Sequence, residues 1–214
     1  MNPLLAQAWQ HAIDTLPLVA ILRGIAPQES DAVGDSLCNA GWRLLEVPLN
    51  SPDPLRSIGA LARRFPDAIV GAGTVRTADE VRQVHAAGGR LVVSPHLDPR
   101  VVEAARTMGM VVLPGVTTPS EAFAALDAGA SGLKLFPAEM IPPAAVKALR
   151  AVLPAPALLL PVGGISPASM AGYRAAGANG FGIGSALYTP GMDAQAVAAS
   201  ARAFADAWAG TMRA

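Results

Sequence analysis

The sequence predicts an α/β protein whose eight parallel strands close into a TIM barrel, with one extra helix at the N-terminus. Short apolar runs, each closed by Gly, Pro or a small polar residue, alternate with Ala-rich segments of helical spacing. The starts of these runs are 20 to 26 residues apart, as a repeated strand–helix unit requires. The 214 residues show no break in composition, so we expect a single domain over residues 1–214.

The extra helix is expected over Pro3–Thr15, before the first strand. Trp9 and Ile13 are four residues apart there, so they share a face that covers the bottom of the barrel. The strands that follow are continuous apolar runs, which suits strands buried on both faces. We expect them at Leu18–Arg23, Leu44–Leu49, Ala68–Thr74, Arg90–Ser94, Met110–Pro114, Gly132–Phe136, Ala157–Val162 and Gly180–Ile183.

The segments between the strands carry helix start and stop signals. Thr77 and Asp98 are suitable N-caps, and Thr118 with Glu121 has the spacing of a capping box. Glycines stand where five helices should end, which favours left-handed caps: Gly41, Gly88, Gly109, Gly129 and Gly177. An open doubly wound sheet is the alternative, but eight even repeats in this length favour a closed barrel.

Composition excludes several classes of protein. The chain has 16 basic and 16 acidic residues, which argues against a nucleic-acid partner or a polybasic membrane contact. Cys38 is the only cysteine, so no internal disulfide is available. We expect no membrane span and no signal peptide, and therefore a cytoplasmic protein. The three histidines have no ligand spacing, which predicts that the protein holds no metal.

Lys134 gives the clearest indication of chemistry. It stands within the apolar run 132–137, where an ammonium is costly to bury unless it is paired or neutral. The chain has only two lysines against fourteen arginines, which indicates that an amine is required here. A desolvated lysine loses its proton and attacks carbonyls, whereas arginine stays protonated. Alternatively, the lysine reaches the barrel rim or only binds an anion.

Glu46 is a second ionisable group inside an apolar strand. By strand alternation it shares a face with Leu44 and Pro48. A carboxylate that faces the barrel interior needs a cationic partner or a catalytic role, and Lys134 and Arg23 are the candidate partners. The alternative is a structural ion pair inside the barrel.

Two glycine loops end the seventh and eighth strands. Gly163-Gly164 follows one strand, and Gly184-Ser185 follows the next and opens a short helix. Loops at these two places in such barrels often cradle a phosphate with backbone N–H groups. We therefore expect a phosphate site here, the alternative being tight turns without a ligand.

Seven motifs stand in order across nearly the whole chain. They are Ile21-Leu22-Arg23-Gly24, Glu46-Val47-Pro48-Leu49-Asn50-Ser51-Pro52, Gly71-Ala72-Gly73-Thr74-Val75, Val93-Ser94-Pro95, Pro114-Gly115, Leu133-Lys134-Leu135-Phe136-Pro137 and Val162-Gly163-Gly164-Ile165. Together they resemble the 2-keto-3-deoxy-6-phosphogluconate/galactonate aldolase family. Asn50-Ser51 and Val162 are similar to the phosphogalactonate branch of that family.

The resemblance implies a class I aldolase that cleaves 2-dehydro-3-deoxy-6-phospho-D-galactonate to pyruvate and D-glyceraldehyde 3-phosphate. Lys134 would form a Schiff base with the C2 ketone, and Glu46 would be the general base. No cofactor or metal is implied, because the protonated imine serves as the electrophile. The resemblance also implies a homotrimer.

The binding residues follow from the same resemblance and from their places at the strand ends. Arg23 and Thr74 would hold the pyruvyl carboxylate, while Pro95 and Phe136 would wall the site. Val162 would lie near C4 of the substrate. The phosphate would be held by Gly163, Gly164, Gly184 and Ser185.

Three other functions stay open at this point. The phosphogluconate epimer is one alternative substrate. A phosphate-binding barrel isomerase or synthase without a covalent lysine is another possibility, and a non-catalytic sugar-phosphate binding protein is the third.

Overall fold

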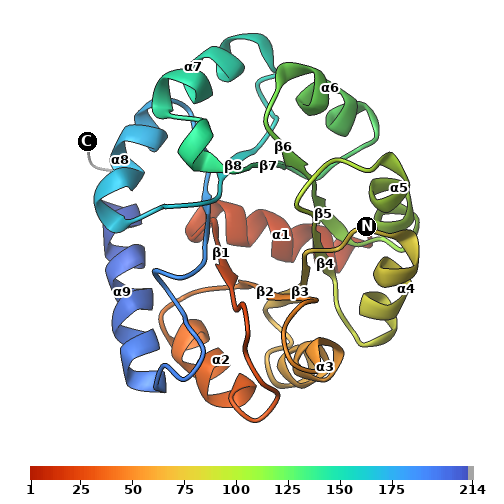
Figure 1. Cartoon of the computed structure of the whole chain (residues 1–214), viewed down its shortest axis with the longest axis vertical. Helices are drawn as coiled ribbons and strands as arrows, with labels where there is room; N and C mark the ends of the chain where they lie inside the picture. The colour runs from red at the N-terminus through yellow and green to blue at the C-terminus, as the bar shows by residue number, and fades with distance from the viewer. Residues whose placement is uncertain (212–214) are drawn as a thin grey trace.

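The computed structural model of the protein describes residues 1–211 as a ring of parallel strands surrounded by helices (Figure 1). The strands are β1 (Leu18–Ile21), β2 (Leu44–Pro48), β3 (Ile69–Gly73), β4 (Leu91–Val93), β5 (Val111–Leu113), β6 (Gly115–Val116), β7 (Leu133–Leu135), β8 (Leu159–Pro161) and β9 (Phe181–Ile183). All of their pairings are parallel. The predicted barrel is therefore confirmed.

The fifth barrel strand continues beyond its predicted end at Pro114, because β5 and β6 lie on either side of this proline, and nine strand segments therefore make eight barrel positions. β5 pairs with β4, whereas β6 pairs with β7. Proline cannot donate a backbone hydrogen bond, but its carbonyl still accepts from Lys134 N at 3.0 Å. A bridge between Val162 and Gly182 joins β8 to β9 and closes the ring.

Helices occupy the predicted places between the strands, except that Gly184-Ser185 opens a hydrogen-bonded turn where a short helix was expected. They are α1 (Pro3–Thr15), α2 (Ser30–Asn39), α3 (Pro54–Arg64), α4 (Ala78–Ala86), α5 (Pro99–Thr107), α6 (Pro119–Asp127), α7 (Pro143–Val152), α8 (Pro167–Ala175) and α9 (Ala194–Thr211), with a short 3-10 helix η1 (Ala138–Met140). Thr77 and Thr118 both form capping boxes, and the side chain of Asp98 caps α5. The five helix-ending glycines all have positive φ, as predicted.

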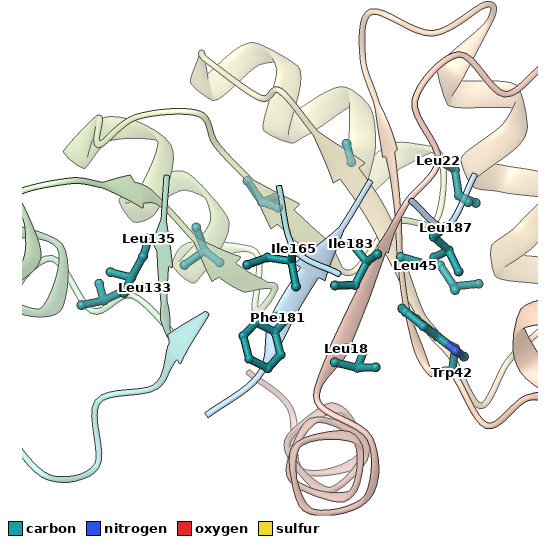
Figure 2. Packing of buried hydrophobic residues seen from close by; sticks show 14 of the residues in the cluster. Leu18, Leu22, Trp42, Leu45, Leu133, Leu135, Ile165, Phe181, Ile183 and Leu187 are labelled. Atoms are coloured by element: carbon teal, nitrogen blue, oxygen red, sulfur yellow. The ribbon is translucent and has the colours of Figure 1, made fainter. Parts of the chain in front are cut away.

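The strands bury both of their faces in two separate apolar clusters. Leu18, Ala20 and Leu22 point outward from the β1 segment into the layer between the strands and helices α2–α9. That layer includes Trp42, Phe181 and Leu187, which Figure 2 shows packed around the outer face of the barrel. Val19 points the other way, into the barrel interior.

Helix α1 closes the N-terminal end of the barrel. Its buried residues Leu5, Trp9 and Ala12 belong to the interior cluster, together with Leu44, Leu91 and other inward-facing strand residues. Figure 1 shows α1 crossing behind the ring of strands. Helix α1 therefore fills the barrel interior at the N-terminal ends of the strands, and the C-terminal ends are left for a site. No helix within residues 1–211 is long and apolar enough to span a membrane.

Candidate active site

A cleft of about 390 Å³ opens at the C-terminal ends of the strands. This is the edge of the barrel at which the sequence places the polar strand ends. Seven of the eleven predicted site residues line the cleft, namely Arg23, Phe136, Val162, Gly163, Gly164, Gly184 and Ser185. The structure therefore brings together the two glycine loops and the arginine predicted from separate parts of the chain.

A small cavity lies at the inner end of this cleft. Glu46 and Lys134 line it, together with Val162. Ile21, Val162 and Gly182 line both spaces, so the cavity and the cleft adjoin. The cavity volume is about 10 Å³, which corresponds to the space of a single water molecule.

Lys134 points into the barrel because its neighbours on β7, Leu133 and Leu135, point outward into the helix layer. The residue is only 7% exposed, and burial lowers the pKa of its amine. Glu46 opposes this effect by raising the pKa, and Arg23 adds to it. The Nζ atom lies 4.6 Å from the centre of the Phe136 ring. The amine therefore has a reduced cost of deprotonation, as a nucleophile requires.

Glu46 comes from β2 and is 1% exposed. Burial raises the pKa of its carboxyl to about 7, although Lys134 and Arg23 favour the ionised form. Its Oε2 atom is buried without a hydrogen-bond partner among the described residues. Since buried polar atoms are nearly always paired, this orphan acceptor fits a group that acts on a ligand or a water. A carboxyl with a pKa near neutrality is suited to both taking and returning a proton.

The Glu46 carboxyl lies directly against residue 73, which is glycine. A Cβ at Gly73 would overlap the Glu46 carboxyl. The next residue, Thr74, has a φ of 60°. This left-handed conformation is rare for a β-branched residue, and such strain is characteristic of functional sites. The glycine-rich end of β3 therefore leaves the space that the Glu46 carboxyl occupies.

Thr74 and Pro95 follow β3 and β4 at the same edge of the barrel, but neither lines the cleft. Pro95 instead packs its backbone against Gly115, where a Cβ would overlap the proline carbonyl. Their predicted roles in binding the carboxylate and walling the site stay predictions.

Among the residues of the site that were not predicted from the sequence, two carry a carboxyl or an amide side chain, Glu139 and Asn50. Glu139, in η1, lines the cleft, and its carboxyl covers Gly163 so closely that a Cβ there would overlap it. Asn50 accepts a hydrogen bond from Arg23 at 2.8 Å. The signal for Glu139 was an acidic residue within four residues of the end of the lysine strand, and the signal for Asn50 was its place directly after the predicted glutamate strand.

The described residues contain no group of three or more His, Cys, Asp or Glu side chains placed to hold a metal ion. The ionisable centre of the site consists instead of one amine, one carboxyl and one guanidinium, those of Lys134, Glu46 and Arg23.

A barrel with a buried amine and carboxyl below an open cleft defines the chain as a (β/α)8-barrel enzyme. The family model described as KDPG and KHG aldolase matches residues 10–200. The chain belongs to this aldolase family, whose members are lyases, and the resemblance drawn from the seven motifs is confirmed.

Individual relatives agree with this assignment. The chain is 50% identical over 179 residues to a probable 2-dehydro-3-deoxy-6-phosphogalactonate aldolase of Rhizobium meliloti, covering 83% of this chain and 84% of that protein. It is 42% identical over 194 residues to the 2-dehydro-3-deoxy-6-phosphogalactonate aldolase of Escherichia coli, covering 90% and 95%. A solved structure described as native KDPGal is 41% identical with a TM-score of 0.91, covering 93% of this chain and 97% of that one.

Proposed function

We propose that the protein cleaves 2-dehydro-3-deoxy-6-phospho-D-galactonate to pyruvate and D-glyceraldehyde 3-phosphate through an imine on Lys134. The observation that carries this proposal is the pairing of a buried amine with a buried carboxyl in one cavity at the inner end of the cleft. The names of the relatives at 50% and 42% identity support the substrate.

The reaction begins at Lys134. Its neutral Nζ attacks the C2 ketone, and loss of water gives a protonated imine. Glu46 takes the proton of the C4 hydroxyl, directly or through one water, and the electrons of the C3–C4 bond move to the imine. The aldehyde leaves, Glu46 helps to protonate the resulting enamine at C3, and hydrolysis of the imine releases pyruvate.

The remaining residues of the site bind and orient the substrate in this proposal. Arg23 and Thr74 hold the pyruvyl carboxylate, and Phe136 and Pro95 limit the access of water. The phosphate lies in the part of the cleft lined by Gly163-Gly164 and Gly184-Ser185. The open approach is at Gly184, where a Cβ would meet nothing within 4 Å, because the Glu139 carboxyl lies against Gly163 and Gly164. The cleft that joins these loops to the lysine cavity supports a substrate that spans both.

Trapping with borohydride in the presence of pyruvate tests the imine. Reduction should add one pyruvyl group to the peptide that contains Lys134, as measured by mass spectrometry. Lys134→Arg should be inactive and untrapped, since arginine keeps its proton. The matched control Lys147→Arg, on α7, should be trapped like the parent protein. Modification at another residue, or none in the parent, would exclude the covalent mechanism.

The choice between the two C4 epimers is a second prediction. We expect the parent protein to prefer the galacto substrate, because Val162 beside the cavity offers no hydroxyl to the gluco epimer. Val162→Thr should shift the ratio of kcat/KM toward the gluco epimer by about 1 kcal/mol, the value of one neutral hydrogen bond. The measurement is kcat/KM on both epimers for both proteins. If the galacto-to-gluco ratio of kcat/KM were unchanged in Val162→Thr, Val162 would not discriminate between the two configurations at C4.

We also infer that the protein acts in the cytoplasm as a homotrimer. A structural relative with 41% identity and a TM-score of 0.91 is a protein cage designed by fusing symmetric oligomeric domains, and this supports an oligomer. Apolar side chains exposed on neighbouring helices support it further. Phe123, Met140 and Val152 are 42%, 70% and 57% exposed on α6, η1 and α7.

A further inference from the structure

Arg23 is held by the loop that follows β2. Its Nη1 atom donates to the side-chain oxygen of Asn50 at 2.8 Å. The adjacent residues repeat this contact, because the Gly24 N–H donates to the Ser51 hydroxyl at 2.9 Å. The loop itself is fixed by the bond from Ser51 N to Pro48 O at 2.9 Å. Two successive residues after β2 thus hold two successive residues after β1.

The contact with Asn50 matters because Arg23 is otherwise an exposed side chain with many rotamers. Arg23 lines the cleft, and its positive charge lowers the pKa values of both Lys134 and Glu46. Anchoring one N–H of the guanidinium leaves its remaining donors for a ligand. The amide of Asn50 therefore restricts where the positive charge lies.

Arginines elsewhere in the described residues are held by backbone carbonyls, as Arg90 is, or by carboxylates. Arg64 is held by Asp35 at 2.6 Å, and Arg100 is held by Asp98 at 2.7 Å. A carboxylate in such a pair neutralises the guanidinium as well as positioning it. At Arg23 the partner is the neutral isostere of aspartate, so the arginine keeps its full charge toward the cleft.

We propose that Asn50 is a positioning residue that aims Arg23 and, by being uncharged, keeps its charge available to the anionic end of a 2-keto acid. This inference rests on the proposed function, because it concerns the same substrate carboxylate. It assigns to residue 50 the control of substrate affinity, while the bond-breaking step belongs to Lys134 and Glu46.

Asn50→Asp is the decisive variant, since it keeps the shape of the anchor and changes only its charge. The half-saturating pyruvate concentration for borohydride trapping at Lys134 should rise about tenfold, as expected when one charge-assisted contact is lost. The amount trapped at saturation should stay that of the parent. Asn50→Ala should raise the same concentration less, by about threefold, because Arg23 keeps its charge but loses its anchor.

A pH profile separates this role from a structural one. Arg23 lowers the pKa of Lys134, and Glu46 raises it, these being the charged groups that act on the amine. Asn50→Asp would offset the charge of Arg23 and so raise the pKa of Lys134. The pH midpoint of trapping, which needs the neutral amine, should therefore move upward. Asn39→Asp adds the same charge at the exposed end of α2 and should leave both the midpoint and the half-saturating concentration unchanged.

The outcomes distinguish this inference from the proposed function. A parent protein that is not trapped at Lys134 overturns both. A trapped parent with Asn50→Asp within twofold of it in half-saturation, and with the same pH midpoint, overturns only the role of Asn50. Equal shifts in Asn50→Asp and Asn39→Asp also overturn it, because the effect would then come from net charge alone.

Discussion

The two ionisable groups at the centre of the site depend on each other. Burial disfavours the charged form of both Glu46 and Lys134, while each favours the charge of the other. The pKa of the carboxyl is raised to about 7, so Glu46 gains its proton as the pH falls through neutrality. A step that needs Glu46 as a base should therefore slow below about pH 7.

Glu46→Gln tests this dependence. Turnover should fall by about 10²–10⁴, the usual contribution of a general base, whereas trapping of pyruvate on Lys134 should persist. The pKa of Lys134 should drop because the negative charge that raises it is gone. The pH midpoint of trapping should therefore move downward.

The comparison requires turnover and trapping measured across pH on the same samples. Glu103→Gln makes the same chemical change on the exposed face of α5 and should behave like the parent protein. If Glu46→Gln kept turnover within a few-fold of the parent, Glu46 would be a structural partner of Lys134.

The sequence predicted Lys134 and Glu46 as catalytic residues because a charged group inside an apolar strand is costly to bury unless it is paired or has a function. It did not predict Glu139 or the contact of Asn50 with Arg23. Asn50 and Arg23 are 27 residues apart, and their meeting follows from the pairing of β1 with β2. Polar residues are common between strands and helices, so nothing in the local sequence marks Glu139 or Asn50 as unusual. Such roles emerge only when the loops are placed in space.

The helices and strands were predicted well where local signals mark their ends. The helix Pro3–Thr15, the N-cap Thr77 of α4 and the capping box of α6 were predicted from the sequence, whereas the capping box that Thr77 forms with Glu80 was not. The predicted strand ends at Arg23 and Thr74 lie beyond β1 and β3. The chain leaves the sheet there, with Arg23 in the cleft and Thr74 in a left-handed conformation. The continuation of the fifth barrel strand beyond Pro114 was also missed. A proline without an N–H interrupts a ladder even where the apolar pattern continues.

Two helical glycines show how packing decides the effect of one added methyl. Gly172→Ala on α8 should stabilise the protein by about 0.5–1 kcal/mol, because alanine is the better helix former and the new Cβ would lie 3.8 Å from Pro143. Gly34→Ala on α2 should destabilise it by about 1–3 kcal/mol, because the new Cβ would overlap the Phe65 ring and lie 2.8 Å from Leu61. Denaturant unfolding of both variants measures the difference. Stabilisation by Gly34→Ala would show that α2 can move away from Phe65.

The barrel has two cores, and their separation explains why the site lies at one end. The outer cluster holds the helices to the strands, and the inner cluster joins the strands to α1. With α1 beneath the barrel, the interior opens only toward the strand ends that carry Lys134 and Glu46. The sequence predicted this arrangement from the even spacing of its strands and the amphipathic helix at the start. It contained no local signal for the outer surface on which copies of the chain would assemble.

The apolar groove beside α7 is the surface on which we expect the trimer to assemble. It is lined by Met140, Ile141, Leu149 and Val152, among others, and α6 lies next to α7 around the ring in Figure 1. Single exposed apolar side chains are normal on a protein surface, but a contiguous apolar groove marks an interface. Burying it against a second copy would remove that surface from water.

The prediction is that sedimentation gives a mass three times that of the 21.8-kDa chain. Met140→Glu should lower this mass toward that of one chain, because a carboxylate is costly to bury in an apolar interface. Its circular dichroism should match the parent, since Met140 is 70% exposed within each chain. Leu4→Glu, at a residue 78% exposed on α1, is the matched control and should leave the mass unchanged. A parent that sediments as a single chain would contradict the trimer. A trimer that survives Met140→Glu would place its interface on another face.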